Sequence, residues 1–470
     1  VTANFTALSN RYQLDSPVNG SFESGIGVVQ GWVCEASAIT LQIDGTNPIQ
    51  AAYGADRPDS QALCGDTANG FAAAINWNGY GNGTHRLSLL ADGQELTQAT
   101  VTVTTLGQDY LRGVSGTTRV ADFPAAGLST PLRWSEPHQN FVVASDSAAA
   151  GLIASATTAG NWESPLAGGV ESGRSLIRGW ACDAQTITAT LDGETLVIPY
   201  GSGRQDTQSL CGDTNNGYAL AINWADWGDG SHQLSLNLDG VPVATRTVQI
   251  ATPAGQGTIT GVQAQHRLAD FPHPGDSLTL QWSEPHQNFR LIGYQPMSTR
   301  RDTAWRVTEI YIATLGRAPE DEGLQYWIGN IQNGGWTPTT VAQGFFDHPA
   351  VQALYPPDTG DDVLLEALYQ SLFGRAPDAE GRAYWLGQLA DGQLARNQLV
   401  ITLIEGGWAN PTAVSDMARF GHRVEVGQAF AAYQAEHGIL ASHLSAADQA
   451  YLGRVGAEVL AGVTADKATR

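Results

Sequence analysis

The sequence contains two copies of one segment, and this duplication constrains the fold more than any other feature. Residues 31–34 (GWVC) return 148 positions later as 179–182 (GWAC), and 134–141 (WSEPHQNF) return unchanged at the same offset. Between these motifs, residues 63–71 (LCGDTANGF) return as 210–218 (LCGDTNNGY). So many matches at a nearly constant offset indicate a duplicated module of roughly 130 residues.

Within each copy, polar and apolar residues alternate over short stretches that end in Asp-Gly. Residues 40–45 (TLQIDG), 188–193 (TATLDG) and 232–240 (HQLSLNLDG) follow this pattern. Alternation with a period of two is typical of strands with one buried face, and Asp-Gly is a hairpin signal. Short alternating strands separated by such turns predict an immunoglobulin-like β-sandwich for each module.

The four cysteines divide equally between the two copies. Pairing within a copy joins Cys34 to Cys64 and Cys182 to Cys211, and loops of that length are worth about 3–4 kcal/mol in the chain-entropy model. The alternative is a metal site, but the Cys-x-x-Cys spacing is absent and each copy lacks further soft ligands. We therefore predict one disulfide in each module, which implies an oxidising compartment.

From about Arg301 the pattern changes from alternation to helical spacing. Residues 305–319 (WRVTEIYIATLGRAP) and 364–377 (LLEALYQSLFGRAP) carry apolar residues at helical intervals and stop at glycine and proline. Each continues with an acidic turn and then Gly-x-x-Tyr-Trp, at 323–327 and 381–385, an offset of 58 residues. This second, independent duplication predicts an all-α domain.

The helical motifs resemble the domain of unknown function 4214 family, which occurs in bacterial secreted and surface proteins. The shared pattern is an aromatic-bearing helix, then Gly-Arg-x-Pro with an acidic residue, then Gly-x-x-Tyr-Trp. Residues 424–430 and 463–466 are similar to the end of that family, so the resemblance runs from Thr303 to Arg470. It implies export and a surface or matrix setting, and it implies no established chemistry. The β modules are not assigned to a named family.

These patterns divide the chain into five parts. We expect an N-terminal strand or extension over 1–14, β-sandwich modules over 15–146 and 162–295, a small-residue linker over 147–161, and the all-α domain over 296–470. The sequence begins at Val1 and lacks a basic segment followed by an apolar one, so we expect a mature chain whose export signal has been removed.

The charge balance disfavours several classes of partner. The chain has 24 Lys and Arg against 46 Asp and Glu, a net charge of −22, and Lys467 is its only lysine. A nucleic-acid binder needs a basic face to neutralise phosphates, and an anionic membrane surface is disfavoured for the same reason. No apolar run is long enough to span a membrane.

The Glu136/His138 pair and its repeat, Glu284/His286, are the most enzyme-like feature, because a carboxylate can orient an imidazole. A hydrolase that uses these residues is the least favoured function. Both pairs are duplicated with their modules and lie between strand residues, so a structural clasp is the preferred interpretation. No catalytic residues are assigned and the chain is predicted not to be an enzyme.

Aromatic rings can stack on sugars, which makes some tryptophans candidate glycan-binding residues. Most follow or precede strands, cysteines or helical motifs and are expected in cores. Three lack such a context and are the candidates for exposed platforms: Trp227, Trp336 and Trp408.

Acidic residues in glycine turns are candidate ligands for structural Ca²⁺, a hard cation that prefers oxygen. They are Asp66, Asn69, Asp213, Asn216, Asp226, Asp229, Asp358, Asp361 and Asp362. None completes a twelve-residue calcium loop, and Asx turns explain the Asp/Asn-Gly pairs without metal. Both interpretations remain open.

The sequence thus favours a non-enzymatic secreted bacterial structural protein, the subunit of a filament, surface layer or matrix that assembles with itself. The N-terminal residues 3–10 are similar to 139–146, and Phe5 and Leu8 are candidate assembly contacts through β-strand addition. The alternative is a carbohydrate-binding adhesin on a surface polysaccharide. The acidic chain with almost no lysine also suits solubility in saline water.

Overall fold

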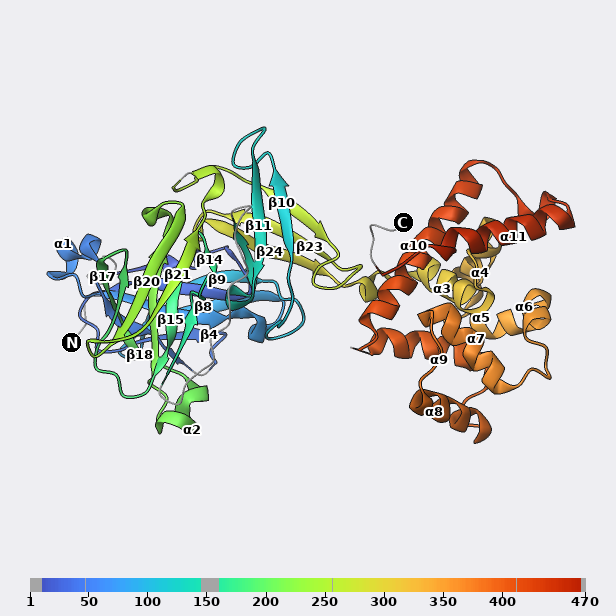
Figure 1. Ribbon diagram of the computed structural model, residues 1–470, viewed down its shortest axis with the longest axis horizontal. Coiled ribbons are helices and arrows are strands. Elements are labelled where there is room, and N and C mark those ends of the chain that lie inside the picture. Colours follow the sequence, from blue (N-terminus) through green and yellow to red (C-terminus); the bar gives the residue numbers. More distant parts are fainter. Residues whose placement is uncertain (1–10, 47, 145–159, 256, 411, 466–470) are drawn as a thin grey trace, which may run out of the picture. The chain divides into compact units, whose positions relative to one another are not determined.

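The computed structural model describes residues 11–46, 48–144, 160–255, 257–410 and 412–465. The chain divides into two compact units. The first, the β unit, comprises residues up to 268 and 278–294, and the second, the helical unit, comprises 269–277 and 295 onward. Figure 1 colours the β unit mainly blue to yellow and helices α3–α11 yellow-gold to red. The candidate assembly residues Phe5 and Leu8 lie outside the described residues.

Module 1 is a β-sandwich with a small third sheet. A four-stranded sheet (order β1-β3-β7-β6) packs on a five-stranded one (β2-β9-β8-β4-β5), and a three-stranded sheet (β10-β11-β12) follows. The strands are β1 (Tyr12–Ser16), β2 (Phe22–Glu23), β3 (Ile26–Val33), β4 (Ile39–Ile43), β5 (Ile49–Gln50), β6 (Ala52–Ala55), β7 (Gly70–Asn76), β8 (Gly83–Ala91), β9 (Gln94–Val103), β10 (Thr117–Ala121), β11 (Ser129–Ser135) and β12 (Asn140–Val143). Short helical turns are η2 (Pro58–Ser60), α1 (Gln61–Cys64), η3 (Trp77–Tyr80) and η4 (Glu136–His138).

Module 2 repeats this architecture, with sheets β13-β15-β19-β18, β14-β21-β20-β16-β17 and β22-β23-β24. Its strands are β13 (Gly160–Ser164), β14 (Val170–Glu171), β15 (Arg174–Ala181), β16 (Ile187–Leu191), β17 (Glu194–Ile198), β18 (Tyr200–Ser202), β19 (Gly217–Asn223), β20 (Gly230–Leu238), β21 (Val241–Ile250), β22 (Gln265–Ala269), β23 (Ser277–Ser283) and β24 (Asn288–Gln295). The turns are η5 (Gln205–Thr207), α2 (Gln208–Cys211), η6 (Trp224–Trp227) and η7 (Pro253–Gly255).

The two four-stranded sheets pack against each other through small side chains. Along β7, Phe71, Ala73 and Ile75 point into the core of module 1, as the period of two requires. Ala72 and Ala74 point the other way and join a separate cluster with Val28, Leu176, Ala219 and Ala221. Because alanines allow close approach, the modules meet face to face along β7 and β19.

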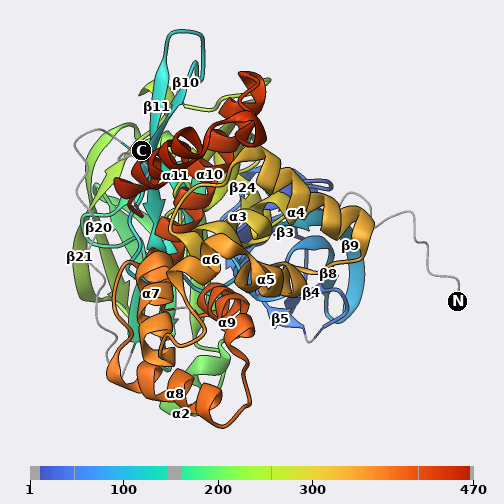
Figure 2. The same cartoon turned by 90° about the vertical axis from the view of Figure 1, so that its right-hand side faces the viewer.

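The helical unit contains the second duplication as two sets of three helices, α3–α5 and α7–α9; the labelled helices can be followed in Figures 1 and 2. Its elements are η8 (Met297–Arg300), α3 (Thr303–Leu315), α4 (Asp321–Gly334), α5 (Pro338–Asp347), α6 (Pro349–Leu354), α7 (Asp361–Phe373), α8 (Ala379–Ala390), α9 (Arg396–Ala409), α10 (Val414–Glu436), η9 (Ala441–His443) and α11 (Ala446–Ala461). Helices α3–α5 correspond to α7–α9, and the Gly-Arg-x-Pro motif ends α3 and α7 with Gly316 and Gly374 in the left-handed region, at φ of 67° and 68°.

The fold class expected from the sequence is confirmed: two disulfide-stapled β modules are followed by a helical region. Within the described residues, no helix is both long and apolar enough to span a bilayer.

Candidate functional site: the junction between the β modules

The repeated Glu-x-His motifs do not form the carboxylate–imidazole pairs that their spacing suggested. Each motif lies in a short turn, η4 in module 1, whose geometry directs its two side chains differently. A carboxylate oxygen of Glu136 accepts a hydrogen bond from the amide of Gly113, and Glu284 accepts one from Gly261. The two glutamates therefore tie a preceding loop to the turn, and each histidine contacts a different carboxylate.

The histidine partners come from the opposite module. His138 of module 1 places Nε2 3.1 Å from Glu171 Oε2 of module 2. Reciprocally, His286 of module 2 places Nε2 3.2 Å from Glu23 Oε2 of module 1. The other ring nitrogen contacts a serine hydroxyl in both cases, with Nδ1 2.6 Å from Ser135 Oγ and 2.8 Å from Ser283 Oγ. The junction thus contains two crossed pairs related by the repeat.

A second crossed arrangement surrounds the serine that follows each glutamate. Ser24 Oγ accepts from Asn140 Nδ2 of its own module at 2.8 Å and from the Leu291 amide of the other module at 3.0 Å. The equivalent Ser172 Oγ accepts from Asn288 Nδ2 at 2.9 Å and from the Val143 amide at 3.0 Å. Each serine therefore joins a closing strand of one module to that of the other.

Burial sets the protonation states of the Glu23–His286 pair, whose side chains are 0% and 1% exposed. Burial lowers the pKa of His286, and the positive charges of Arg290 and Arg174 lower it further against the opposing effect of Glu23. For Glu23, burial alone would raise the pKa, but His286 and Arg290 outweigh it, so its pKa is lowered. At neutral pH this corresponds to an ionised Glu23 facing a neutral imidazole.

The sequence reasoning missed Glu23 and Glu171, although the repeat contained a signal for them. Residues 23–25 and 171–173 read Glu-Ser-Gly in both copies, at the same offset of 148. A Cβ on Gly25 would lie 2.2 Å from the carbonyl oxygen of Gln139, and one on Gly173 would lie 2.3 Å from that of Gln287. The glycine therefore lets the Glu-Ser segment approach the turn that carries the histidine.

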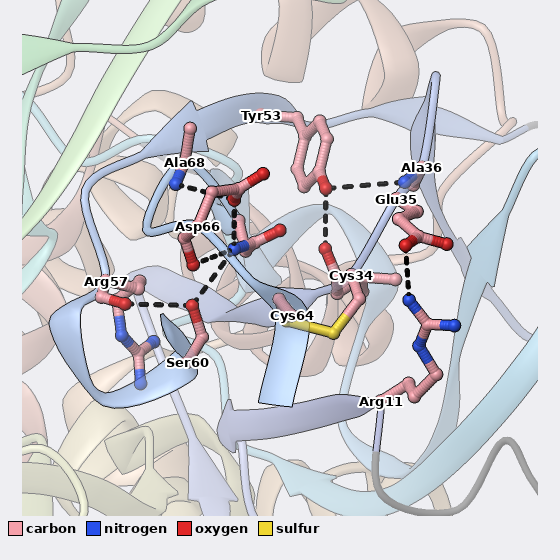
Figure 3. Close-up of a disulfide and its surroundings, with 12 residues drawn as sticks. Arg11, Cys34, Glu35, Ala36, Tyr53, Arg57, Ser60, Cys64, Asp66 and Ala68 are labelled. Carbon is pink, nitrogen blue, oxygen red and sulfur yellow. Dashed lines mark hydrogen bonds and ion pairs between the residues drawn. A yellow bond between two sulfur atoms is a disulfide. The ribbon is translucent and has the colours of Figure 1, made fainter. Parts of the chain in front are cut away.

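Each disulfide begins directly after β3 or β15, the strand that follows the Glu-Ser-Gly segment in each module. Figure 3 shows the Cys34–Cys64 disulfide of module 1 beside Asp66, one of the calcium candidates. Cys34 is bonded to Cys64 and Cys182 to Cys211, each within its own module. In the adjacent turn, Asp66 Oδ1 accepts from Asn69 Nδ2 at 2.7 Å and from the Ala68 amide at 3.2 Å. Asn69 Nδ2 also donates to Ser60 Oγ at 3.1 Å, so this is a hydrogen-bonded Asx turn.

The remaining calcium candidates are similarly engaged with protein groups. Asn216 Nδ2 donates to Asp213 Oδ1, Asn223 Nδ2 donates to Asp226 Oδ1, and the amide and hydroxyl of Thr252 donate to Asp229 Oδ1. In the helical unit, Arg396 pairs with Asp361 and Arg382 with Asp362. Asp358 precedes the start of α7. Among the residues that the structure describes, no group of three or more acidic, histidine or cysteine side chains could hold a metal ion.

The three candidate tryptophans differ in exposure. Trp227 is partly buried against the module 2 core. Trp408 is partly buried, and its Nε1 donates at 2.6 Å to Glu309 Oε1, a buried carboxylate that also accepts from Trp305 and Arg301. Trp336 is 37% exposed and contacts Trp327 with ring centroids 5.8 Å apart.

Comparisons with known proteins add limited information on the β unit. No curated protein matches the sequence. Among solved structures, "Structure of surface layer protein SbsC, domains 4-9" aligns with 11% identity and a TM-score of 0.16, over 55% of this chain and 33% of that one. "Titin Ig tandem domains A164-A165" aligns with 9% identity and a TM-score of 0.13, over 52% of this chain and 95% of that one. With TM-scores this low, these alignments do not bear on function.

The helical unit gives a clearer result. The family described as "Domain of unknown function (DUF4214)" matches twice, at residues 300–354 and 342–406. The first match covers α3–α6, and the second runs from within α5 to within α9, so each match includes one copy of the helical motif and the two overlap over 342–354. The C-terminal third of the chain therefore carries the DUF4214 repeats that its motifs predicted.

Proposed function

We propose that this chain is a secreted, non-enzymatic structural protein of a bacterial surface or extracellular matrix, which assembles with further copies of itself. The crossed junction is the observation that carries the proposal. His138 and His286, which most resemble catalytic residues, contact glutamates of the opposite module, so their role is structural. The two disulfides support an oxidising, extracellular setting.

The outer sheet of module 2 supplies a surface suited to self-association. Its edge strand β17 has five residues, whereas the equivalent β5 has two. Val197 on this edge strand is 60% exposed, and Val241 at the start of β21, near the opposite edge of the same sheet, is 64% exposed. The equivalent positions in module 1 are Gln50 and Gln94. A long edge strand with exposed apolar side chains is a template for pairing with another chain.

The test compares the wild-type chain with the double variant Val197→Gln/Val241→Gln, which introduces the residues that module 1 already tolerates. We expect the purified wild-type protein to assemble without any ligand, as measured by sedimentation velocity and negative-stain electron microscopy. The double variant is expected to need a concentration at least about tenfold higher, equivalent to about 1.4 kcal/mol per contact. Leu210→Gln, which removes a leucine that is 56% exposed elsewhere in module 2, is the matched control.

The same material distinguishes the carbohydrate-binding alternative, which the exposure of Trp336 favours. A chain that stays monomeric at every concentration, and binds a glycan array only while Trp336 is present, would support an adhesin and contradict self-assembly. If the double variant assembles as strongly as the wild-type chain, the proposed structural function stands, but the outer sheet of module 2 is not the contact surface.

A further inference from the structure

A small cavity lies at the junction, between matched residues of the two modules. It has a volume of about 20 Å³, and residues from equivalent positions of both repeats line it. Val28 is matched by Leu176 and Asn140 by Asn288. At two further matched positions the repeats differ: Ile26 and Val142 of module 1 correspond to Arg174 and Arg290 of module 2. Module 2 thus contributes two cations where module 1 contributes aliphatic side chains.

These two arginines make no ion pair among the residues that the structure describes. Arg290 is only 5% exposed and Arg174 is partly buried, and the Nε atom of each has no hydrogen-bond partner in the described part of the chain. By contrast, Arg178 in the same cavity wall is held by Glu163 and by the carbonyl oxygen of Pro137, 3.1 Å away. A buried donor or charge without a partner is costly, so a native arrangement of this kind requires an explanation.

The nearby carboxylates face histidines and serines. Glu23 Oε1 accepts from Ser21 Oγ at 2.8 Å, and Glu23 Oε2, which has no hydrogen-bond partner among the described residues, faces His286. Glu171 accepts from Ser175 Oγ at 3.0 Å and faces His138. Neither glutamate makes an ion pair with Arg174 or Arg290 among the described residues. The charge of Glu23 acts on Arg290 only at longer range, and burial lowers the pKa of Arg290.

The size and lining of the cavity define the ligand class. Its volume is close to that of one water-sized sphere, which favours a monatomic anion over phosphate, sulfate or an organic carboxylate. The donors are guanidinium groups, which carry no acceptor and favour anions. The remaining walls include Ile26, Val28 and Leu176, and such apolar walls suit a weakly hydrated ion.

We propose that this cavity binds a single small monovalent anion of the chloride class, held between the guanidinium groups of Arg174 and Arg290. The anion neutralises part of the charge of the two arginines at the module junction, where no carboxylate among the described residues forms an ion pair with them. Packing of the two modules is therefore linked to halide concentration, and the stability of the β unit rises when halide is bound.

Bromide tests this site directly, because its anomalous scattering distinguishes it from water. Crystals of the full chain grown in sodium bromide should show one anomalous peak within hydrogen-bonding distance of both guanidiniums. In solution at constant ionic strength, replacing gluconate by bromide at roughly 100 times its dissociation constant should raise the melting temperature of the β unit by about 5 °C. Gluconate is too large for the cavity.

Repeat-guided variants provide the controls. Arg174→Ile/Arg290→Val installs the residues of module 1 and should abolish both the peak and the bromide-specific shift. Arg86→Gln, which replaces an exposed arginine of module 1 by its counterpart Gln233, should leave both unchanged. Water density without an anomalous peak, or an equal response to gluconate and bromide, would overturn the proposal. The wild-type crystal decides the question even if the double variant does not fold.

Discussion

His286 shows how burial gives one residue a role that its chemistry alone would not reveal. The ring is enclosed at the junction, with Glu23, Arg290, Arg174 and Ser16 Oγ around it. Burial and the two arginines lower its pKa from the usual 6.5. The imidazole of His286 therefore binds a proton less readily in the folded β unit than in the unfolded chain, and this difference makes the free energy of unfolding depend on pH.

This linkage predicts a loss of stability on mild acidification. Below about pH 6.5 the unfolded chain binds a proton at this position that the folded chain does not, and the free energy of unfolding falls by up to about 1.4 kcal/mol per pH unit. The pKa of Glu23 is lowered from 4.5, so its contribution is lost only at lower pH. Denaturant unfolding at pH 7 and pH 5.5 measures the effect. His286→Gln should flatten this dependence, apart from the smaller contribution of His266, whose pKa burial also lowers.

A further comparison checks that assignment. The matched control is His437→Gln, at an exposed histidine of the helical unit. This variant should keep the wild-type pH dependence of the stability of the β unit. If His286→Gln retains the full acid sensitivity, the proton is bound elsewhere.

At the scale of elements, the two modules differ in the hydrogen bonding of a tryptophan that occupies the same position in both repeats. In module 2, Trp224 Nε1 donates to Ser175 Oγ at 2.6 Å, and this hydroxyl donates onward to Glu171. In module 1 the equivalent of Ser175 is Gly27, and Trp77 Nε1 has no hydrogen-bond partner among the described residues. Strand β15 is thus connected to β14 and η6 by a hydroxyl that β3 lacks.

Ser175→Ala should therefore destabilise module 2. The change leaves the buried indole N–H of Trp224 unpaired and removes one donor from Glu171, at a cost of about 1–3 kcal/mol in the free energy of unfolding. Chemical denaturation followed by tryptophan fluorescence measures it. Ser235→Ala on the exposed face of β20 removes only the contact with Thr245 and should cost less than about 0.5 kcal/mol. Equal effects of the two changes would contradict this account.

The repeats made the individual elements predictable but not their packing. The disulfide partners and the ends of α3 and α7 could be predicted because loop closure and Gly-Pro stops are local. The alanines of β7 did not indicate the contact between the modules, because small residues occur both on solvent-exposed faces and in close interfaces. The contacts of Glu136 and His138 could not be predicted from their spacing, because the turn directs the two side chains to different partners, Gly113 and Glu171. The partner of His138 lies on another module, which spacing alone does not indicate.

At the scale of the whole molecule, the β unit has the organisation of a dimer whose two subunits are fused in one chain. Each module presents the same alanine face, the same Glu-Ser-Gly segment and the same Ser-Glu-Pro-His turn to the other. Such an interface is isologous, so a single module contains both halves of it. The asymmetry is concentrated at the cavity, where Ile26 and Val142 face Arg174 and Arg290.

This organisation predicts that module 1 expressed alone forms a symmetric homodimer, and that it does so more tightly than module 2. In a dimer of residues 11–144, two copies of Ile26 and Val142 take the places of the unpaired arginines in the cavity lining. In a dimer of residues 160–294, the cavity receives two copies each of Arg174 and Arg290 and only two Glu171 carboxylates, and each unpaired buried charge costs several kcal/mol. We expect the dissociation constant of module 1 to be lower by at least about tenfold, as measured by sedimentation equilibrium.

His138→Ala provides the internal control for this dimer, because one substitution removes both crossed pairs of the module 1 homodimer but only one pair of the intact chain. It should therefore weaken the homodimer by about twice the free energy by which it destabilises the parent β unit. His85 of β8, which is partly buried and contacts Asp44 at 2.6 Å, makes none of the junction contacts described above, and His85→Ala should leave dimerisation unchanged. A module 1 that remains monomeric while folded, or a module 2 that dimerises more tightly, would show that the junction depends on the arginines of module 2 and that fusion of the two copies created the interface.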